Sequence, residues 1–243
     1  MNRKKKILIL LLLSLSVYFV HQLTDKKDFT YAVIGDSFSM GENSYGGYTY
    51  GYEDYLLDYF KHTRKVEFID FYTSKNENIN TLYNKFLKDD IEVINNKSYN
   101  FKRILTESNI ITISIGLNDI IYEYYINKNG LDSQYKEDKM VEYTYNNFKS
   151  LMNQLSKYSS NIFVLGYPER NEYKNLIKKL NTKYKNYCKN KKMEFIDSNN
   201  LLNKEEYFDN INTIFPNTEG YKKISERIIK IYKNKENSWN NRK

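Results

Sequence analysis

Short apolar runs alternate with amphipathic stretches along most of the chain. The apolar runs are mostly β-branched and end at polar residues or glycine, which is typical of buried strands. The amphipathic stretches repeat apolar side chains at helical spacing. The pattern therefore predicts strands at Tyr31–Ile34, Val66–Phe71, Asn109–Ile115, Ile162–Leu165 and Glu194–Ile196, and helices at Tyr52–Phe60, Ile79–Leu87, Met140–Tyr158, Glu172–Cys188 and Glu219–Tyr232.

This order of elements predicts an α/β domain that spans residues 31–235. Strand and helix alternate about five times, and parallel strands need crossover helices between them. We therefore expect a parallel sheet of about five strands with helices on both faces. In such sheets, functional side chains gather beyond the carboxyl ends of the strands.

The first 24 residues have the pattern of a membrane-targeting segment. Four cations at Arg3–Lys6 precede an uncharged apolar run from Ile7 to Val20. This order predicts a signal anchor over residues 1–24, with a membrane helix, a cytoplasmic N-terminus and an extracytoplasmic domain. The alternative is a cleaved signal and a secreted protein. Residues 25–30 are expected to be a linker, and residues 236–243 a polar tail.

The net charge of +8 is concentrated at the two ends of the chain. Residues 1–24 carry +4 and residues 222–243 carry +6, which leaves the body at −2. A near-neutral body argues against nucleic acid as a partner. The basic C-terminal helix is either a solvated face or a surface that attracts anionic envelope polymers. With one cysteine and two histidines, the composition excludes a disulfide framework and predicts no metal site.

Three short segments next to predicted strands or helices carry candidate catalytic residues. The first strand ends in Gly35-Asp36-Ser37, and a serine at a sharp strand exit can act as a nucleophile. The third strand ends in Gly116-Leu117-Asn118-Asp119, where the asparagine could donate to an oxyanion. The third segment, Phe215–Tyr221, leads into the last helix. Each segment taken alone also fits an ordinary turn or helix cap.

Taken together and in this order, the three segments resemble those of the SGNH/GDSL hydrolase family. The resemblance covers roughly residues 30 to 232 and implies a flavodoxin-like α/β/α sandwich without a cofactor. It implies hydrolysis or transfer of acyl esters on lipids, glycans or small molecules. By the same resemblance, Ser37 is the nucleophile and gives its backbone N–H to the oxyanion. Asn118 gives a side-chain N–H, and Asn76 stands nearest to the position of a third, backbone donor.

The last segment departs from the family pattern, because Asn212 and Phe215 occupy the positions of the catalytic aspartate and histidine. Neither side chain can take a proton from a serine. The sequence therefore predicts an ester hydrolase or acyltransferase-like protein with an incomplete triad, acting on an acylated lipid or an envelope glycan. The alternatives are an inactive, membrane-tethered binding module and a structural partner in an envelope complex.

A segment rich in glycine and tyrosine follows the candidate nucleophile. Tyr48 and Tyr50 alternate there with Gly46, Gly47 and Gly51. Glycines give a loop freedom, and tyrosine rings suit a sugar or an acyl chain. We therefore expect Tyr48 and Tyr50 to contact the substrate, the alternative being a loop packed by its own aromatic side chains.

Overall fold

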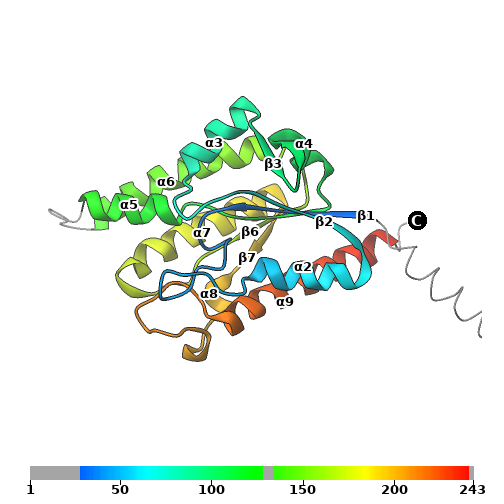
Figure 1. Cartoon of the computed structure of the whole chain (residues 1–243). Coiled ribbons are helices and arrows are strands. Elements are labelled where there is room, and N and C mark those ends of the chain that lie inside the picture. The colour runs from blue at the N-terminus through cyan, green and yellow to red at the C-terminus, as the bar shows by residue number, and fades with distance from the viewer. Residues whose placement is uncertain (1–27, 128–133, 241–243) are drawn as a thin grey trace, which may run out of the picture.

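The computed structural model describes residues 28–127 and 134–240 as a single α/β unit (Figure 1). Its main sheet has five parallel strands in the order β2-β1-β5-β6-β7. The strands are β1 (Asp28–Gly35), β2 (Lys65–Thr73), β5 (Ile110–Ser114), β6 (Ile162–Leu165) and β7 (Glu194–Ile196). The principal helices are α2 (Tyr52–Thr63), α3 (Ile79–Lys88), α4 (Phe101–Glu107), α5 (Leu117–Asn127), α6 (Gln134–Leu155), α7 (Lys174–Lys191) and α9 (Thr218–Asn240).

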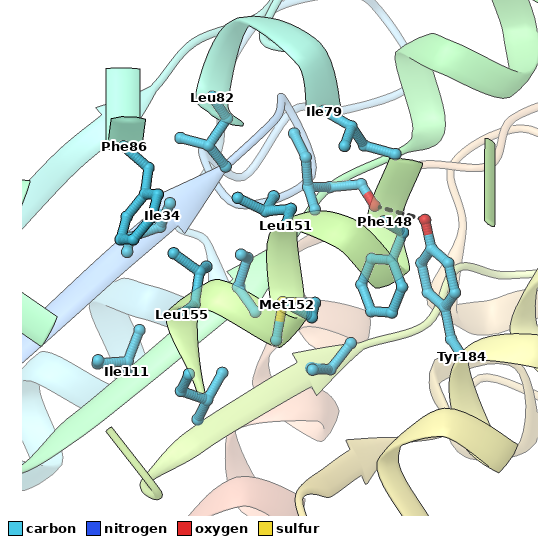
Figure 2. Close-up of a cluster of buried hydrophobic side chains, with 14 of the residues drawn as sticks. Ile34, Ile79, Leu82, Phe86, Ile111, Phe148, Leu151, Met152, Leu155 and Tyr184 are labelled. Carbon is cyan, nitrogen blue, oxygen red and sulfur yellow. Dashed lines mark hydrogen bonds between the residues drawn. The ribbon is translucent and has the colours of Figure 1, made fainter. Parts of the chain in front are cut away.

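The prediction of a three-layer α/β/α domain with five parallel strands is confirmed. Helices α3, α4, α6 and α7 cover one face of the sheet, and α2 and α9 cover the other (Figure 1). Figure 2 shows the core of the first face, where side chains of α6 meet strand residues Ile34 and Ile111. In this core the Phe148 and Tyr184 rings stack with their centroids 3.6 Å apart.

The register of the sheet brings the ends of β1 and β5 to one edge. Gly35 at the end of β1 pairs with Ser114 at the end of β5, and on the other side with Thr73 of β2. All the strands run in the same direction, so the segments that follow these three residues leave the sheet from the same edge. This edge is where the sequence places its candidate chemistry.

The periodicity did not predict a two-stranded antiparallel hairpin, β3 (Ile91–Ile94) and β4 (Lys97–Asn100). Asn95 and Asn96 both have positive φ at its turn, which asparagine tolerates better than most residues do. The Tyr99 hydroxyl donates a 2.5 Å hydrogen bond to Glu67 of β2 and so fixes the hairpin to the sheet. The strands are too short to give a periodic signal.

Two expected boundaries differ from the observed ones. Strand β1 begins at Asp28, inside the expected linker, because Phe29 is buried and Thr30 is bonded to the neighbouring Asn109 side chain. Helix α9 continues to Asn240, so the expected polar tail begins inside a helix. The expected signal anchor and membrane helix lie outside the described residues. Within the described ranges, no helix is both long and apolar enough to span a bilayer.

Candidate active site

The loop that carries Ser37 begins with a backbone shape that favours glycine. Gly35 has a φ of +143°, and a Cβ built on it would lie 2.0 Å from the Ser114 carbonyl oxygen. The next residue, Asp36, donates its backbone N–H to the same carbonyl at 2.9 Å. The chain therefore leaves β1 in tight contact with β5 before it reaches the serine.

The Asp36 side chain is a buried junction between three segments. Its Oδ1 accepts hydrogen bonds from the Phe38 N–H at 3.2 Å and from the Ser114 hydroxyl at 3.0 Å. Its Oδ2 accepts from the Leu117 N–H at 3.3 Å and from the Tyr167 hydroxyl at 2.6 Å. The loops after β1, β5 and β6 are therefore joined at one carboxylate directly beside Ser37.

Burial raises the pKa of Asp36 to about 7, although four hydrogen bonds favour the charged form. Burial likewise raises the pKa of Asp119 to about 6. A buried carboxyl group with a raised pKa binds its proton more tightly in the folded state than in the unfolded state. Stability from this source is complete below the unfolded pKa and is lost as the pH rises through the folded value.

We therefore expect the free energy of unfolding to fall as the pH rises from 5 to 8, with Asp36 contributing about 2–3 kcal/mol of the decrease. Urea unfolding at both pH values measures the change. Asp36→Asn removes the titrating group and should flatten the dependence, although the variant will be less stable at both values. A stability that increases over this range would contradict the expectation.

Ser37 lies within this edge and is only 2% exposed. Its carbonyl oxygen accepts the backbone N–H groups of Met40 and Glu42, each at 3.1 Å, which closes a compact turn. Among the residues that the structure describes, no carboxylate or imidazole forms a hydrogen bond with the Ser37 hydroxyl. The serine is thus positioned at the strand exit, but its hydroxyl is not paired with a base.

Asn118 lies in the first turn of α5 and holds the loop after β2. Its carboxamide nitrogen donates to the carbonyl oxygens of Lys75 and Glu77, both at 2.8 Å. The adjacent Asp119 accepts the Ile79 N–H at 3.1 Å, at the start of α3. Both amide hydrogens of Asn118 are therefore engaged, and an oxyanion could receive one only by replacing a carbonyl.

Asn76 lies on the same loop and is exposed to solvent. Its backbone N–H donates to the Ser74 hydroxyl at 3.4 Å. The structure thus brings Asn76 and Asn118 to neighbouring positions, since the Lys75 carbonyl joins them. The loops after β1 and β5 also meet, through Asp36 and the Leu117 N–H.

The last segment of the resemblance also reaches the serine loop. The Tyr221 hydroxyl of α9 donates to the Glu42 carbonyl at 2.7 Å, and the Thr218 and Thr49 hydroxyls lie 2.7 Å apart. Phe215 precedes this helix, is half-buried and packs against the core beneath α2 and α9. Asn212 is exposed and takes no part in that packing. These two positions offer no group that can accept a proton.

The segment that carries Tyr48 and Tyr50 forms a hairpin that is bonded to neighbouring segments. Glu42 and Tyr48 pair as an antiparallel bridge, and Lys75 forms an ion pair of 2.8 Å with the buried Glu42 carboxylate. The Tyr50 hydroxyl donates to Asp58, and its ring packs at 4.7 Å against Tyr55 on α2. The Tyr50 side chain is thus held against α2, whereas the Tyr48 side chain is 51% exposed.

Several residues that shape the site were not among the predicted ones, namely Glu42, Lys75, Ser114 and Tyr167. Ser114 is the only hydroxyl at the end of the β5 run, and Tyr167 follows the glycine that ends β6. Their position at strand ends was a usable signal. Nothing in the sequence indicates that all three loops share one carboxylate.

Comparison with known proteins gives the same picture of the fold. A lipolytic G-D-S-L family protein from Veillonella parvula shares 14% identity, with a TM-score of 0.57 over 84% of this chain and 98% of that chain. A lipase from a goat rumen metagenome shares 15% identity, with a TM-score of 0.64 over 82% and 95%. A catalytic mutant of Axe2, an acetylxylan esterase from Geobacillus stearothermophilus, shares 13%, with a TM-score of 0.59 over 84% and 94%.

A search of curated proteins finds no match to this chain. A family model described as GDSL-like Lipase/Acylhydrolase matches residues 31–228. The match includes the Gly35-Asp36-Ser37 exit, the start of α5 and the first three turns of α9. Since it covers well over half of the sequence, the chain belongs to the family of GDSL-like lipases and acylhydrolases.

Proposed function

We propose that this chain is a GDSL-family protein that binds an acyl ester of an envelope glycan or lipid at Ser37 and turns it over very slowly. The observation that carries the proposal is Phe215, which stands where the family resemblance puts the catalytic histidine. Its aromatic ring packs into the core beneath α2 and α9, and no ionisable side chain in the described ranges is bonded to the Ser37 hydroxyl in its place.

A serine hydroxyl without a base is a poor nucleophile at neutral pH. Loss of one triad member lowers the rate by about four to six orders of magnitude in serine hydrolases. The second requirement, a free oxyanion donor, is also weakened, because Asn118 uses both amide hydrogens to hold the loop at Lys75 and Glu77. Binding of an ester does not require either group to react.

Fluorophosphonate labelling and hydrolysis of p-nitrophenyl acetate test this function. We expect the wild type to exceed Ser37→Ala by less than about tenfold in hydrolysis, because no base activates the hydroxyl. Binding of an acetylated oligosaccharide should persist in both proteins. Strong labelling of the wild type that disappears in Ser37→Ala would contradict the proposal and indicate a working hydrolase.

A working hydrolase is the second candidate, and one observation favours it. The backbone N–H of the buried Glu42 donates to the Ser37 carbonyl, so a carboxylate lies in the same loop as the serine, and its ion-pair partner Lys75 comes from the loop after β2. If this pair supplies the base, Glu42→Gln should abolish the labelling that Ser37→Ala abolishes. Asp58→Asn is the matched control, since Asp58 lies on α2 and is bonded to Tyr50.

We further propose that the domain lies outside the membrane and is anchored through residues 1–24. The support is the order of cations and apolar residues in the sequence. The basic C-terminal helix would then face anionic polymers of the envelope. Protease treatment of intact and of permeabilised cells tests the topology, and protection of the domain in intact cells would contradict it.

A further inference from the structure

A groove of about 350 Å³ lies between α3, α5 and α6, beside the candidate oxyanion donor. Its wall includes Asn118 and Asn76, so it borders the site directly. The opposite wall comes from α5 and α6. The lining residues are Asn76, Asn78, Asn80, Asn118, Asp119, Tyr122, Glu123 and Tyr143.

The charge of the groove argues for an uncharged ligand. Among the described residues, no lysine, arginine or histidine lines it, which disfavours phosphate and carboxylate groups. Asp119 is 9% exposed and already accepts the Ile79 N–H, which leaves Glu123 as the accessible carboxylate of the wall. In the described part of the chain, no three metal-ligating side chains cluster, so a cation is not favoured either.

The polar side chains of the groove match a ligand rich in hydroxyl groups. Asn76 and Asn80 are exposed, and each carboxamide can both donate and accept hydrogen bonds. Asn78 uses its oxygen to cap α3 at Thr81. An alkyl chain would displace the water bonded to these amides and offer them no hydrogen bond in return, which costs free energy.

Two aromatic rings complete the recognition surface. Tyr122 on α5 is 64% exposed and Tyr143 on α6 is 51% exposed, and both line the groove. Single exposed rings occur elsewhere on this protein, but these two lie together on one groove, and contiguous exposed apolar surface marks contact sites better than scattered side chains do. A tyrosine ring offers an apolar face for the C–H face of a pyranose and a hydroxyl for its oxygens.

We propose that this groove binds two or three residues of a neutral glycan, with the ester-bearing sugar next to Asn118. The groove volume suits about that many rings. This inference rests on the proposed function for the position of the acyl group at Ser37, and it specifies the substrate as a glycan ester rather than a lipid. The recognition of the sugar chain itself needs only the groove.

Titration of the protein with xylohexaose and with chitohexaose, followed by NMR, tests the groove. We expect at least one of these neutral hexasaccharides to bind with a Kd below about 1 mM. Tyr122→Ala and Tyr143→Ala should each weaken binding about tenfold, because each removes a stacking face. Asn80→Ala should weaken it about threefold through the loss of one amide.

One control variant and a separate hydrolysis measurement distinguish this inference from the proposed function. Tyr45→Ala removes an 80% exposed ring on the Glu42–Tyr48 hairpin, outside the groove, and should leave binding unchanged. Fast ester hydrolysis together with normal glycan binding would overturn the proposed function alone.

Three results would overturn the groove proposal. The first is failure of both hexasaccharides to bind at about 10 mM. The second is binding that Tyr122→Ala and Tyr143→Ala leave intact. The third is displacement of the sugar by dodecanoate, which would identify an acyl-chain site. Circular dichroism checks that the variants fold, which is expected because both tyrosines are exposed.

Discussion

Replacement of Gly35 by alanine is expected to lower the free energy of unfolding by more than about 3 kcal/mol, from backbone strain and overlap together. The added Cβ would lie 2.0 Å from the Ser114 carbonyl oxygen and 2.8 Å from the Ser39 hydroxyl. The carbonyl belongs to a neighbouring central strand and cannot move aside cheaply. The φ of +143° adds strain for any L-residue. Urea unfolding at pH 7 measures the loss.

The matched control is Gly47→Ala in the Glu42–Tyr48 hairpin. Its Cβ would meet only the Asn43 side chain, at 3.7 Å. We expect a change of less than about 0.5 kcal/mol, because the substitution meets no backbone atom. Equal effects at the two glycines would show that the exit of β1 is not held as tightly as the contact with Ser114 indicates.

Restoration of the missing base should raise esterase activity strongly. In the double variant Asn212→Asp/Phe215→His, an imidazole and its orienting carboxylate return to the positions of the family resemblance. We expect kcat/KM for p-nitrophenyl acetate to rise about 10²–10⁴-fold, which is part of what a complete triad contributes. Phe215 contributes to the core beneath α2 and α9, so the variant will also be less stable, and thermal unfolding must be followed in parallel.

Two further variants test whether the gain depends on Ser37 and on both restored residues. Addition of Ser37→Ala to the double variant should return the activity to the wild-type level, since the new base acts through this hydroxyl. Phe215→His alone should give a smaller gain, because the ring lacks its orienting partner. A folded double variant without any gain would show that Phe215 does not face Ser37, and it would remove the main support for the proposed function.

The central strands could be predicted from the sequence because they are buried on both faces. Residues 110–113 and Ile162–Leu165 are uninterrupted apolar or β-branched runs, which are typical of strands in a parallel sheet. The β3–β4 hairpin could not be predicted, since its strands alternate weakly and it is held by a distant contact, Tyr99 to Glu67. Asn118 was assigned to a strand-end block, and the helix that starts there was missed.

The segments that form the candidate site could be predicted, but the hydrogen bonds between them could not. Ser37, Asn118 and the approach to α9 were expected to meet, and hydrogen bonds through Asp36, Leu117 and Tyr221 join their loops. Which polar hydrogens of the site are free to bind a ligand could not be predicted. Whether the hydrogens of Asn118 are free depends on the carbonyls of Lys75 and Glu77, and no local pattern encodes their position.

The junction at Asp36 has a consequence for reading motifs in this family. The aspartate next to the serine accepts hydrogen bonds from the backbone or side chains of Phe38, Ser114, Leu117 and Tyr167, and so holds three strand exits in register. Gly35 and Asp36 therefore serve the fold at this edge whether or not the chain cleaves esters. Two of the three residues in the Gly-Asp-Ser segment thus report the architecture of the sheet edge, and neither by itself indicates turnover.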